Sequence, residues 1–338
     1  MSSQGGGGSP PVPVGGQGGF PTLGGNGGEG GGDGGEGGAY VCPSPTTGVA
    51  LALTDLSFGE GNNGQWKAIG FNIDGLVSDS ASTDVCQPNA GGNPDIPYPD
   101  GNNGIDNSFG KNLVPLILGL VPEWPTTVNT YIDEGLFNTM LKIYCLPPTG
   151  DASGLTMKVF NGTNLGSVPN YDGTDEWPVA PEILSDLSDP ESSTLVFDNS
   201  SVSEQLFDSG DPSTIVLTIP IEFQKGTTFL KLTLYHARIT MTLSDDRKSA
   251  TGGIIGGVLN TEEVVDQLDK VAFAADICDQ ANYMAAVNFV RQSSDIMADG
   301  SQDPSSTCDG ISFGIAFEMN EIQIGPVGEA SIPALSCQ

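Results

Sequence analysis

Two acidic loops offer the oxygen ligands that calcium prefers. The first loop places oxygen-bearing residues at positions 1, 5, 7 and 9 of the calcium-loop pattern D-x-[DN]-x-[DN]-G, namely Asp295, Asp299, Ser301 and Asp303. Gly300 occupies the glycine position, but Met297 stands where position 3 needs an oxygen. We therefore expect weak binding, with a dissociation constant on the order of 10⁻⁴–10⁻³ M. An ordinary Asp- and Gly-rich turn without an ion is the alternative.

The second loop, residues 78–110, is dense in Asp, Asn, Ser, Pro and Gly and ends in DGNNGIDNSFG. A loop of this length is uncommon in a compact domain and often has a function. Asp100, Asn102 and Asp106 form an oxygen-rich cluster within it. This cluster is the second candidate calcium site, and ion-free turns are again the alternative.

Residues 310–314 match the GxSxG pattern of serine hydrolases, but their context differs from the hydrolase one. That chemistry needs the serine on a sharp turn between a strand and a helix, whereas Ser312 lies in an alternating strand pattern. The single histidine, His236, also precedes the serine in the chain. We interpret Ser312 as a small residue on the outer face of a strand and His236 as a structural or exposed histidine.

Other chemistry is left open or excluded by residue type. A glycosidase needs two suitably separated carboxylates. The chain has 42 acidic residues, and the sequence does not show which two of them would form such a pair. The glycines of GGIIGG lack the spacing of a phosphate loop, and Glu262 and Glu263 occupy the helix start where an anion would bind. A surface platform made by Trp66, Trp124 or Trp177 would instead indicate glycan binding.

The charge balance excludes nucleic acid as a partner. Lys and Arg number 11 against 42 Asp and Glu, giving a formal charge of −31. So acidic a chain repels polyanions, and no basic patch interrupts the pattern. The chain also contains no apolar run of the roughly 20 residues that a membrane helix needs.

The six cysteines are widely spaced, without a CxxC pair, which is typical of disulfides formed in an oxidising compartment. We expect all six to be oxidised. Cys278 and Cys308 flank the second predicted helix, so they are the first pairing that we expect. Closure of their loop would stabilise the fold by roughly 3–4 kcal/mol.

The predicted domains are a disordered, glycine-rich tether over residues 1–39 and a mainly β domain over residues 40–338, with a subdivision near residue 190 as an alternative. The tether begins MSSQGGGGS, without a basic start or an apolar core, so we expect no signal peptide in it. If a processed lipoprotein cysteine stood at Met1, the glycine spacer would follow it naturally. This composition predicts a secreted protein or one tethered to the outer membrane surface.

The acidic loops are positioned by strongly alternating segments. Residues 214–243 predict two long antiparallel strands, with a bulge near Tyr235 and His236 where the apolar phase slips. Residues 66–75, WKAIGFNIDG, and 310–319 predict further strands. Between these β segments, two helices form a hairpin, one capped by Asn260 and one near residues 280–290. The predicted fold is a mainly β, antiparallel sandwich-like domain with this C-terminal helical hairpin inserted.

Several segments resemble uncharacterised secreted lipoproteins of myxobacteria and related soil bacteria. They are the glycine tail, VCPSPTTG, FNIDG, DGNNGIDNSFG and SSDIMADGSQDPSSTCDGISFGIAF. The resemblance covers nearly the whole chain. It implies an exported, surface-tethered protein, and it implies no particular chemistry.

Three function hypotheses follow, and the first is favoured. The protein is a non-enzymatic binding or adhesion module for a glycan or protein at the cell surface, an extracellular hydrolase that uses a carboxylate pair, or a self-assembling structural subunit. An exposed aromatic platform favours the first hypothesis. A cleft with two converging carboxylates favours the second, and an unpaired edge strand favours the third.

Overall fold

The computed structural model describes residues 42, 44, 46–61, 64–89, 92–223, 226–330 and 337. The predicted tether lies outside these described residues. Residues Cys42–Gln338 form one compact unit. This unit is mainly β, as predicted.

The described residues of this unit form ten strands and four α-helices. The strands are β1 (Gly48–Ser57), β2 (Asn138–Tyr144), β3 (Ala152–Gly162), β4 (Glu176–Val179), β5 (Val196–Ser203), β6 (Leu206–Asp208), β7 (Ser213–Phe223), β8 (Gly226–Leu243), β9 (Ser249–Asn260) and β10 (Gly310–Val327). The helices are α1 (Val114–Leu120), α2 (Trp124–Asp133), α3 (Thr261–Ala274) and α4 (Gln280–Gln292). Short helical turns occupy Gln65–Ala68, Asn102–Gly104, Phe109–Leu113 and Pro181–Ile183.

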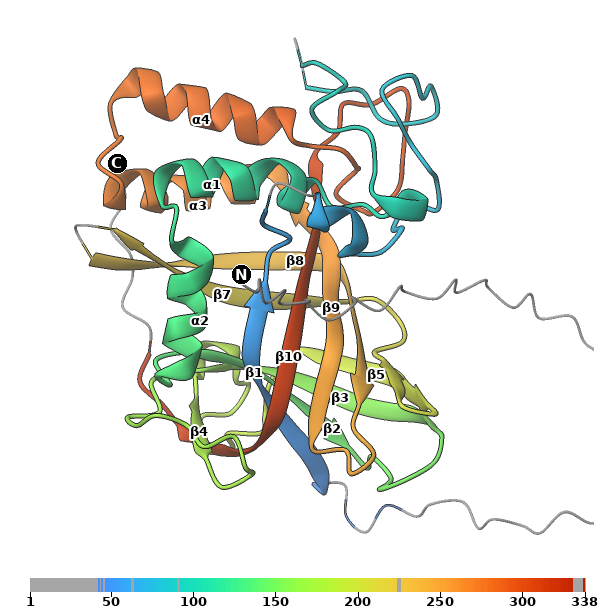
Figure 1. Cartoon of the computed structure of the whole chain (residues 1–338), viewed down its shortest axis with the longest axis vertical. Helices are drawn as coiled ribbons and strands as arrows, with labels where there is room; N and C mark the ends of the chain where they lie inside the picture. Colours follow the sequence, from blue (N-terminus) through green and yellow to red (C-terminus); the bar gives the residue numbers. More distant parts are fainter. Residues whose placement is uncertain are drawn as a thin grey trace, which may run out of the picture. The chain divides into compact units, whose positions relative to one another are not determined.

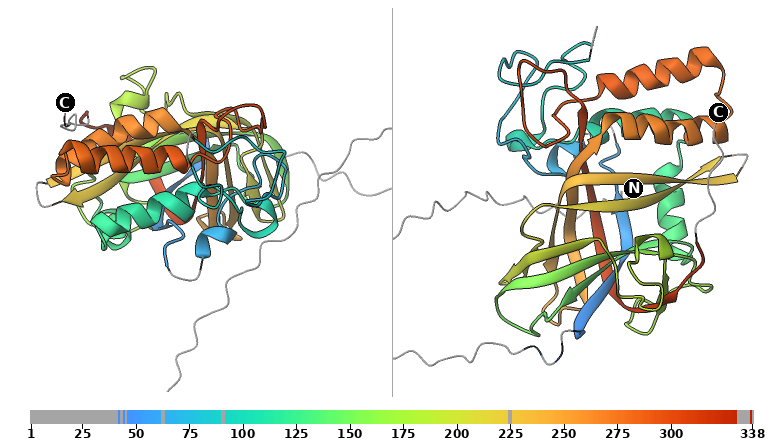
Figure 2. Two further views of the ribbon diagram at one scale, coloured as in Figure 1. Left: turned by 90° about the horizontal axis from the view of Figure 1, so that it is seen from above. Right: turned by 180° about the vertical axis from the view of Figure 1, so that it is seen from behind.

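All ten strands belong to one sheet, and eight of them pair in a closed antiparallel ring. The order around the ring is β10, β1, β2, β3, β5, β6, β8, β9 and back to β10. Strand β7 pairs with β8 beside the ring, and β4 runs parallel to the end of β10. Figure 1 and the rear view in Figure 2 show β1, β9 and β10 on one side and β2, β3 and β5 on the other. The finer prediction of a two-layer sandwich stays a prediction.

The β7–β8 hairpin follows the predicted alternation. Ile215, Leu217 and Ile219 are buried on β7, and the alternate leucines of β8 face them in register. The register of β8 with β9 then shifts between Tyr235 and Arg238, and His236 adopts a φ of 51°. The predicted bulge is therefore confirmed, and it lets one strand keep its apolar side chains in the core on both sides of the slip.

Helix α2 covers the edge of β7. The Trp124 indole stacks on Phe58 with ring centroids 4.2 Å apart, and its Nε1–H donates to the carbonyl of Pro220 on β7 at 3.0 Å. Pro220 itself has no N–H to offer a further strand. This stretch of the edge is therefore a poor template for pairing with another strand. That weakens the hypothesis of self-assembly through this edge.

Helices α3 and α4 follow one another between β9 and β10 and lie side by side in both figures (Figures 1 and 2). As predicted, Asn260 caps α3: its side-chain oxygen accepts from the amides of Glu262 and Glu263 at 3.0 and 3.2 Å. Arg291 near the end of α4 donates two 2.7 Å hydrogen bonds to Glu262, which join the two helices.

The strand predicted at 66–75 is wrong. Residues Gln65–Ala68 form a 3₁₀ turn, and only Phe71 makes an isolated bridge, to Asp106. The turn follows Gly64, which has a φ of 66°. This left-handed conformation redirects the chain and breaks the extended pattern that the alternating side chains suggested.

All six cysteines are oxidised, as predicted, but the expected Cys278–Cys308 pairing is wrong. The three bonds are Cys42–Cys145, Cys86–Cys308 and Cys278–Cys337. Cys308 instead lies against the long loop before β2, because Gln87 and Thr307 form a parallel bridge there. Proximity in sequence therefore misled the pairing.

We predict that the Cys86–Cys308 bond stabilises the fold more than the Cys278–Cys337 bond does, because it closes the longer loop. The double variant Cys86→Ala/Cys308→Ala should lower the free energy of unfolding by about 2–5 kcal/mol. The matched control is Cys278→Ala/Cys337→Ala. Its smaller separation of 59 residues, against 222, predicts a loss about 1 kcal/mol smaller in the chain-entropy model. Denaturant unfolding of both variants measures this order, and the reverse order would contradict it.

Candidate functional site

The first predicted calcium loop does not gather its acids around one point. Asp299 accepts hydrogen bonds from the amide and hydroxyl of Ser301, at 3.0 and 2.6 Å. Asp303 does the same with Ser305, at 2.9 and 2.6 Å. These local bonds hold the pKa of each exposed carboxyl below its usual value. Both residues therefore stabilise separate turns.

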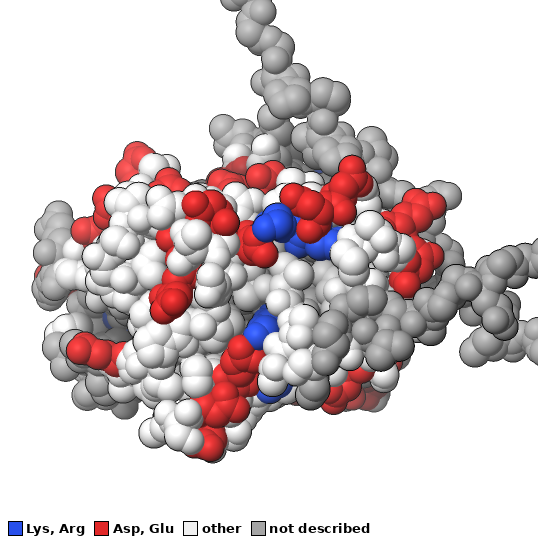
Figure 3. All heavy atoms as spheres, turned by 90° about the horizontal axis from the view of Figure 1, so that it is seen from below, with Lys and Arg blue, Asp and Glu red and all other residues white. Residues whose placement is uncertain are grey.

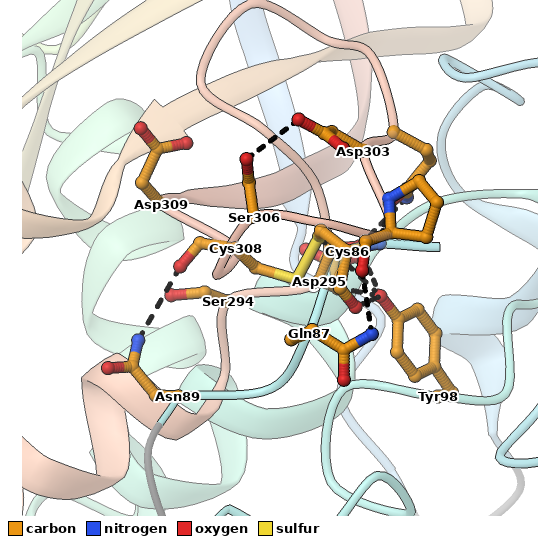
Figure 4. Close-up of a disulfide and its surroundings, with 12 residues drawn as sticks. Cys86, Gln87, Asn89, Tyr98, Ser294, Asp295, Asp303, Ser306, Cys308 and Asp309 are labelled. Atoms are coloured by element: carbon orange, nitrogen blue, oxygen red, sulfur yellow. Dashed lines mark hydrogen bonds between the residues drawn. A yellow bond between two sulfur atoms is a disulfide. The ribbon is translucent and has the colours of Figure 1, made fainter. Parts of the chain in front are cut away.

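Asp295 lies away from them in the interior. It is 4% exposed, and its carboxylate accepts from the amide of Ser312 at 2.8 Å and from the Ser312 hydroxyl. The backbone carbonyl of Asp295 lies 3.1 Å from the Tyr98 hydroxyl (Figure 4). Asp295 thus ties the segment after α4 to β10, and this structural role has no counterpart in the calcium pattern.

The second predicted cluster is also spread out. Asp100 accepts from the amide of Ser78 at 2.5 Å, and Asp106 accepts from the amide of Ile73 at 2.6 Å. Asn102 is exposed in a 3₁₀ turn. Within the described part of the chain, no group of three or more His, Cys, Asp or Glu residues is placed to hold a metal ion. Calcium binding stays a prediction.

Burial, together with the charges of Asp295, Asp100 and Asp106 from the two loops, raises the pKa of Tyr98. The Tyr98 hydroxyl lies beside the Cys86–Cys308 bond (Figure 4). Burial raises the pKa of Asp106 to about 9, with smaller contributions from Asp74, Asp295 and Asp100. Burial also raises the pKa of Asp295 to about 7 and of Asp100 to about 6. The sequence showed two separate acidic loops, and only the fold brings them into one electrostatically coupled group.

Ser312 lies in β10, as the alternation predicts, but its outer-face position is wrong. The residue is fully buried, and its hydroxyl accepts from the amide of Ser108 at 2.8 Å. The loop segments that contain Ser108 and Asp295, which we call the loop layer, pack over this part of β10, so both faces of the strand are covered. A serine enclosed in this way is not available as a nucleophile.

The tryptophans divide clearly between core and surface. Trp124 and Trp177 are fully buried, whereas Trp66 is half-buried in the 3₁₀ turn. Trp66 lines a pocket of about 720 Å³. The other lining residues are Gly59, Glu60, Gly61, Gly64, Lys67, Gly110, Lys111, Val114, Pro115, Leu118 and Gly119.

Two glycines allow the backbone to pack closely around Trp66. A Cβ atom on Gly59 would lie 2.8 Å from the Trp66 Cα, and one on Gly110 would lie 2.9 Å from its Cβ. Gly59 also has a φ of 73°, which a residue with a side chain adopts at a cost. The tryptophan is therefore held by backbone contacts from both sides of the pocket.

Two lysines approach the Trp66 ring. The Nζ atoms of Lys67 and Lys111 lie 5.7 and 5.8 Å from its centroid, within cation–π range. Lys111 also donates to the carbonyls of Pro97 and Pro99, at 3.3 and 3.2 Å, and burial lowers its pKa to about 8. Lys67 is exposed. Lys111 therefore anchors the wall, and Lys67 is the cation that faces solvent.

The acidic content of this pocket is small. Glu60 is the only carboxylate among its lining residues, and it accepts from the amide of Phe58 at 2.7 Å. A pair of converging carboxylates, which a glycosidase needs, is thus absent from the lining of this pocket. The arrangement suits binding rather than hydrolysis.

Comparisons with known proteins returned no relative: no family model matches the chain, and no curated protein or solved structure does. In the described part of the chain, no helix combines the length and the apolar character that crossing a membrane demands.

We predict that the buried acids make stability fall as pH rises. The folded state holds a proton on Asp106 up to a pKa of about 9, whereas the unfolded chain releases it near the ordinary aspartate pKa of 3.8. Stability is thus greatest below about pH 4 for this group and falls until about pH 9. Asp106→Asn should flatten that fall, and exposed Asp198→Asn should not. Melting curves across this range provide the measurement, and an unchanged slope for Asp106→Asn would refute the assignment.

Proposed function

We propose that the protein is a non-enzymatic binding module that holds a glycan at the Trp66 pocket. The observation behind the proposal is the placement of this one tryptophan. Of the three tryptophans, Trp66 alone lines a surface pocket, and glycine backbones fix its position. Pockets of a few hundred cubic ångströms with an aromatic wall and a few polar groups are typical ligand sites.

The chemistry of the wall favours a sugar ring with an acidic group. The face of an indole is electron-rich and attracts the polarised C–H bonds of a pyranose, while Val114, Pro115 and Leu118 extend the apolar surface. The exposed ammonium of Lys67 is a local cation that attracts one carboxylate or sulfate group, whereas the net charge of −31 disfavours a polyanionic chain. A glycan with a single acidic group is therefore the ligand class that we favour.

The setting of this binding module is the outside of the cell. Three disulfides are compatible with an oxidising compartment. The glycine-rich composition of residues 1–39 supports a spacer between a surface anchor and the folded unit. We propose that the protein is exported and attached to the outer membrane surface through this segment.

A glycan array followed by titration tests the proposal. Trp66→Ala should lower the affinity for an array hit at least about tenfold, because truncation removes a central aromatic contact. Trp66→Phe should retain part of the affinity. Met284→Ala, which alters an exposed apolar residue on α4, is the matched control and should bind as the parent does. If no glycan binds, or if Trp66→Ala binds as tightly as the parent, the proposal is wrong.

A further inference from the structure

A second pocket lies at the opposite end of the ring, where three turns meet. Its volume is about 780 Å³. The turns are those between β2 and β3, β5 and β6, and β8 and β9, and they supply Thr149, Gly150, Ser203, Glu204, Gln205, Leu206, Thr242, Asp245 and Arg247. Figure 3 views this end of the molecule from below, where lysine and arginine side chains lie among many acidic ones.

Arg247 is the buried member of this lining. It is 3% exposed, whereas the other eight lining residues are exposed. Its Nη2 donates to the carbonyls of Gly150 and Glu204, at 3.0 and 3.1 Å. Its Nε and Nη1 are buried without a hydrogen-bond partner. The guanidinium therefore keeps three unused N–H groups beneath the pocket.

The other two arginines behave differently. Arg238 pairs with Asp208, and Arg291 pairs with Glu262, in each case through two hydrogen bonds. Arg247 makes no ion pair with a carboxylate of the described residues. A buried cation with unpaired donors is unfavourable unless an acceptor reaches it, and a carboxylate is the acceptor that suits a guanidinium best.

The rim of the pocket has the opposite charge. Glu204 and Asp245 are exposed carboxylates, and Gln205 donates to Asp245 across the gap between two turns. A simple anion approaching Arg247 would be repelled by this rim. A ligand that also has an ammonium group would be attracted by both parts of the pocket.

We propose that this pocket binds the carboxylate of a small zwitterion, namely an α-amino acid or a short peptide, with its ammonium group against Asp245. Because Nε and Nη1 are buried, the ligand displaces the exposed Gln205–Asp245 pair to reach them. Pairs of this exposed kind contribute little stability, so displacement is inexpensive. This site is independent of the Trp66 pocket.

Titration with the dipeptide Ala-Ala, followed by NMR, tests the proposal. We expect a dissociation constant on the order of 1 mM. The C-terminal amide of Ala-Ala should bind at least about tenfold more weakly, and N-acetyl-Ala-Ala severalfold more weakly, since each loses one charge. If the amide binds as well as the dipeptide, the carboxylate contact is wrong. If the N-acetyl form binds as well, the zwitterion assignment is wrong. Lack of Ala-Ala binding at roughly 10 mM overturns the proposal as a whole.

Three variants locate the site. Arg247→Lys keeps the charge but removes the planar set of donors, and it should abolish binding of Ala-Ala. Asp245→Asn changes an exposed residue and should weaken Ala-Ala severalfold while leaving N-acetyl-Ala-Ala unchanged or tighter. Lys248→Gln, on the same turn but outside the pocket lining, is the matched control and should bind as the parent does. If Arg247→Lys does not fold, the Asp245→Asn comparison decides alone, and equal losses for both ligands would contradict the proposal.

Discussion

The buried contact between Asp295 and Ser312 organises one whole end of the molecule. A carboxylate in the interior requires hydrogen-bond donors, and the amide and hydroxyl of Ser312 supply them. The same hydroxyl accepts from the amide of Ser108, and the Ser108 hydroxyl donates to the carbonyl of Ser293. Three segments, which contain Ser108, residues 293–295 and Ser312, are thereby joined at one point on β10.

The Trp66 pocket depends on this junction. The helical turn Phe109–Leu113 begins directly after Ser108 and supplies Gly110 and Lys111 to the pocket. The side chain of Asn107 donates to the carbonyls of Ile69 and Gly314, at 2.8 and 3.1 Å, and so fixes the turn that contains Trp66 against β10. Asp295, which the sequence suggested as a metal ligand, therefore acts through packing, by positioning the walls of the Trp66 pocket.

Local sequence patterns predicted most of the strands and helices. They could not predict which segments that are distant in the chain lie in contact. Alternation located the β7–β8 hairpin and its bulge because period-two burial is a local property of a strand. The same alternation predicted Ser312 on an outer face, because a local pattern contains no information about the loop layer that covers that face. The sequence did not separate the half-buried Trp66 from the buried Trp124, because the pocket of Trp66 needs Gly110 and Lys111, which the fold brings from another segment. The predicted disulfide pairing was wrong for the same reason, because Cys308 bonds to Cys86, which lies far from it in the chain.

The central claim is that Trp66, and neither of the buried tryptophans, contacts a glycan. The three tryptophans give three indole N–H signals in an NMR spectrum, which makes this claim directly observable. The measurement is a titration of the protein with an acidic oligosaccharide, with the signals assigned through Trp66→Phe. The account predicts that the Trp66 signal moves in proportion to occupancy while those of Trp124 and Trp177 stay in place. Binding that leaves the Trp66 signal unmoved would contradict it.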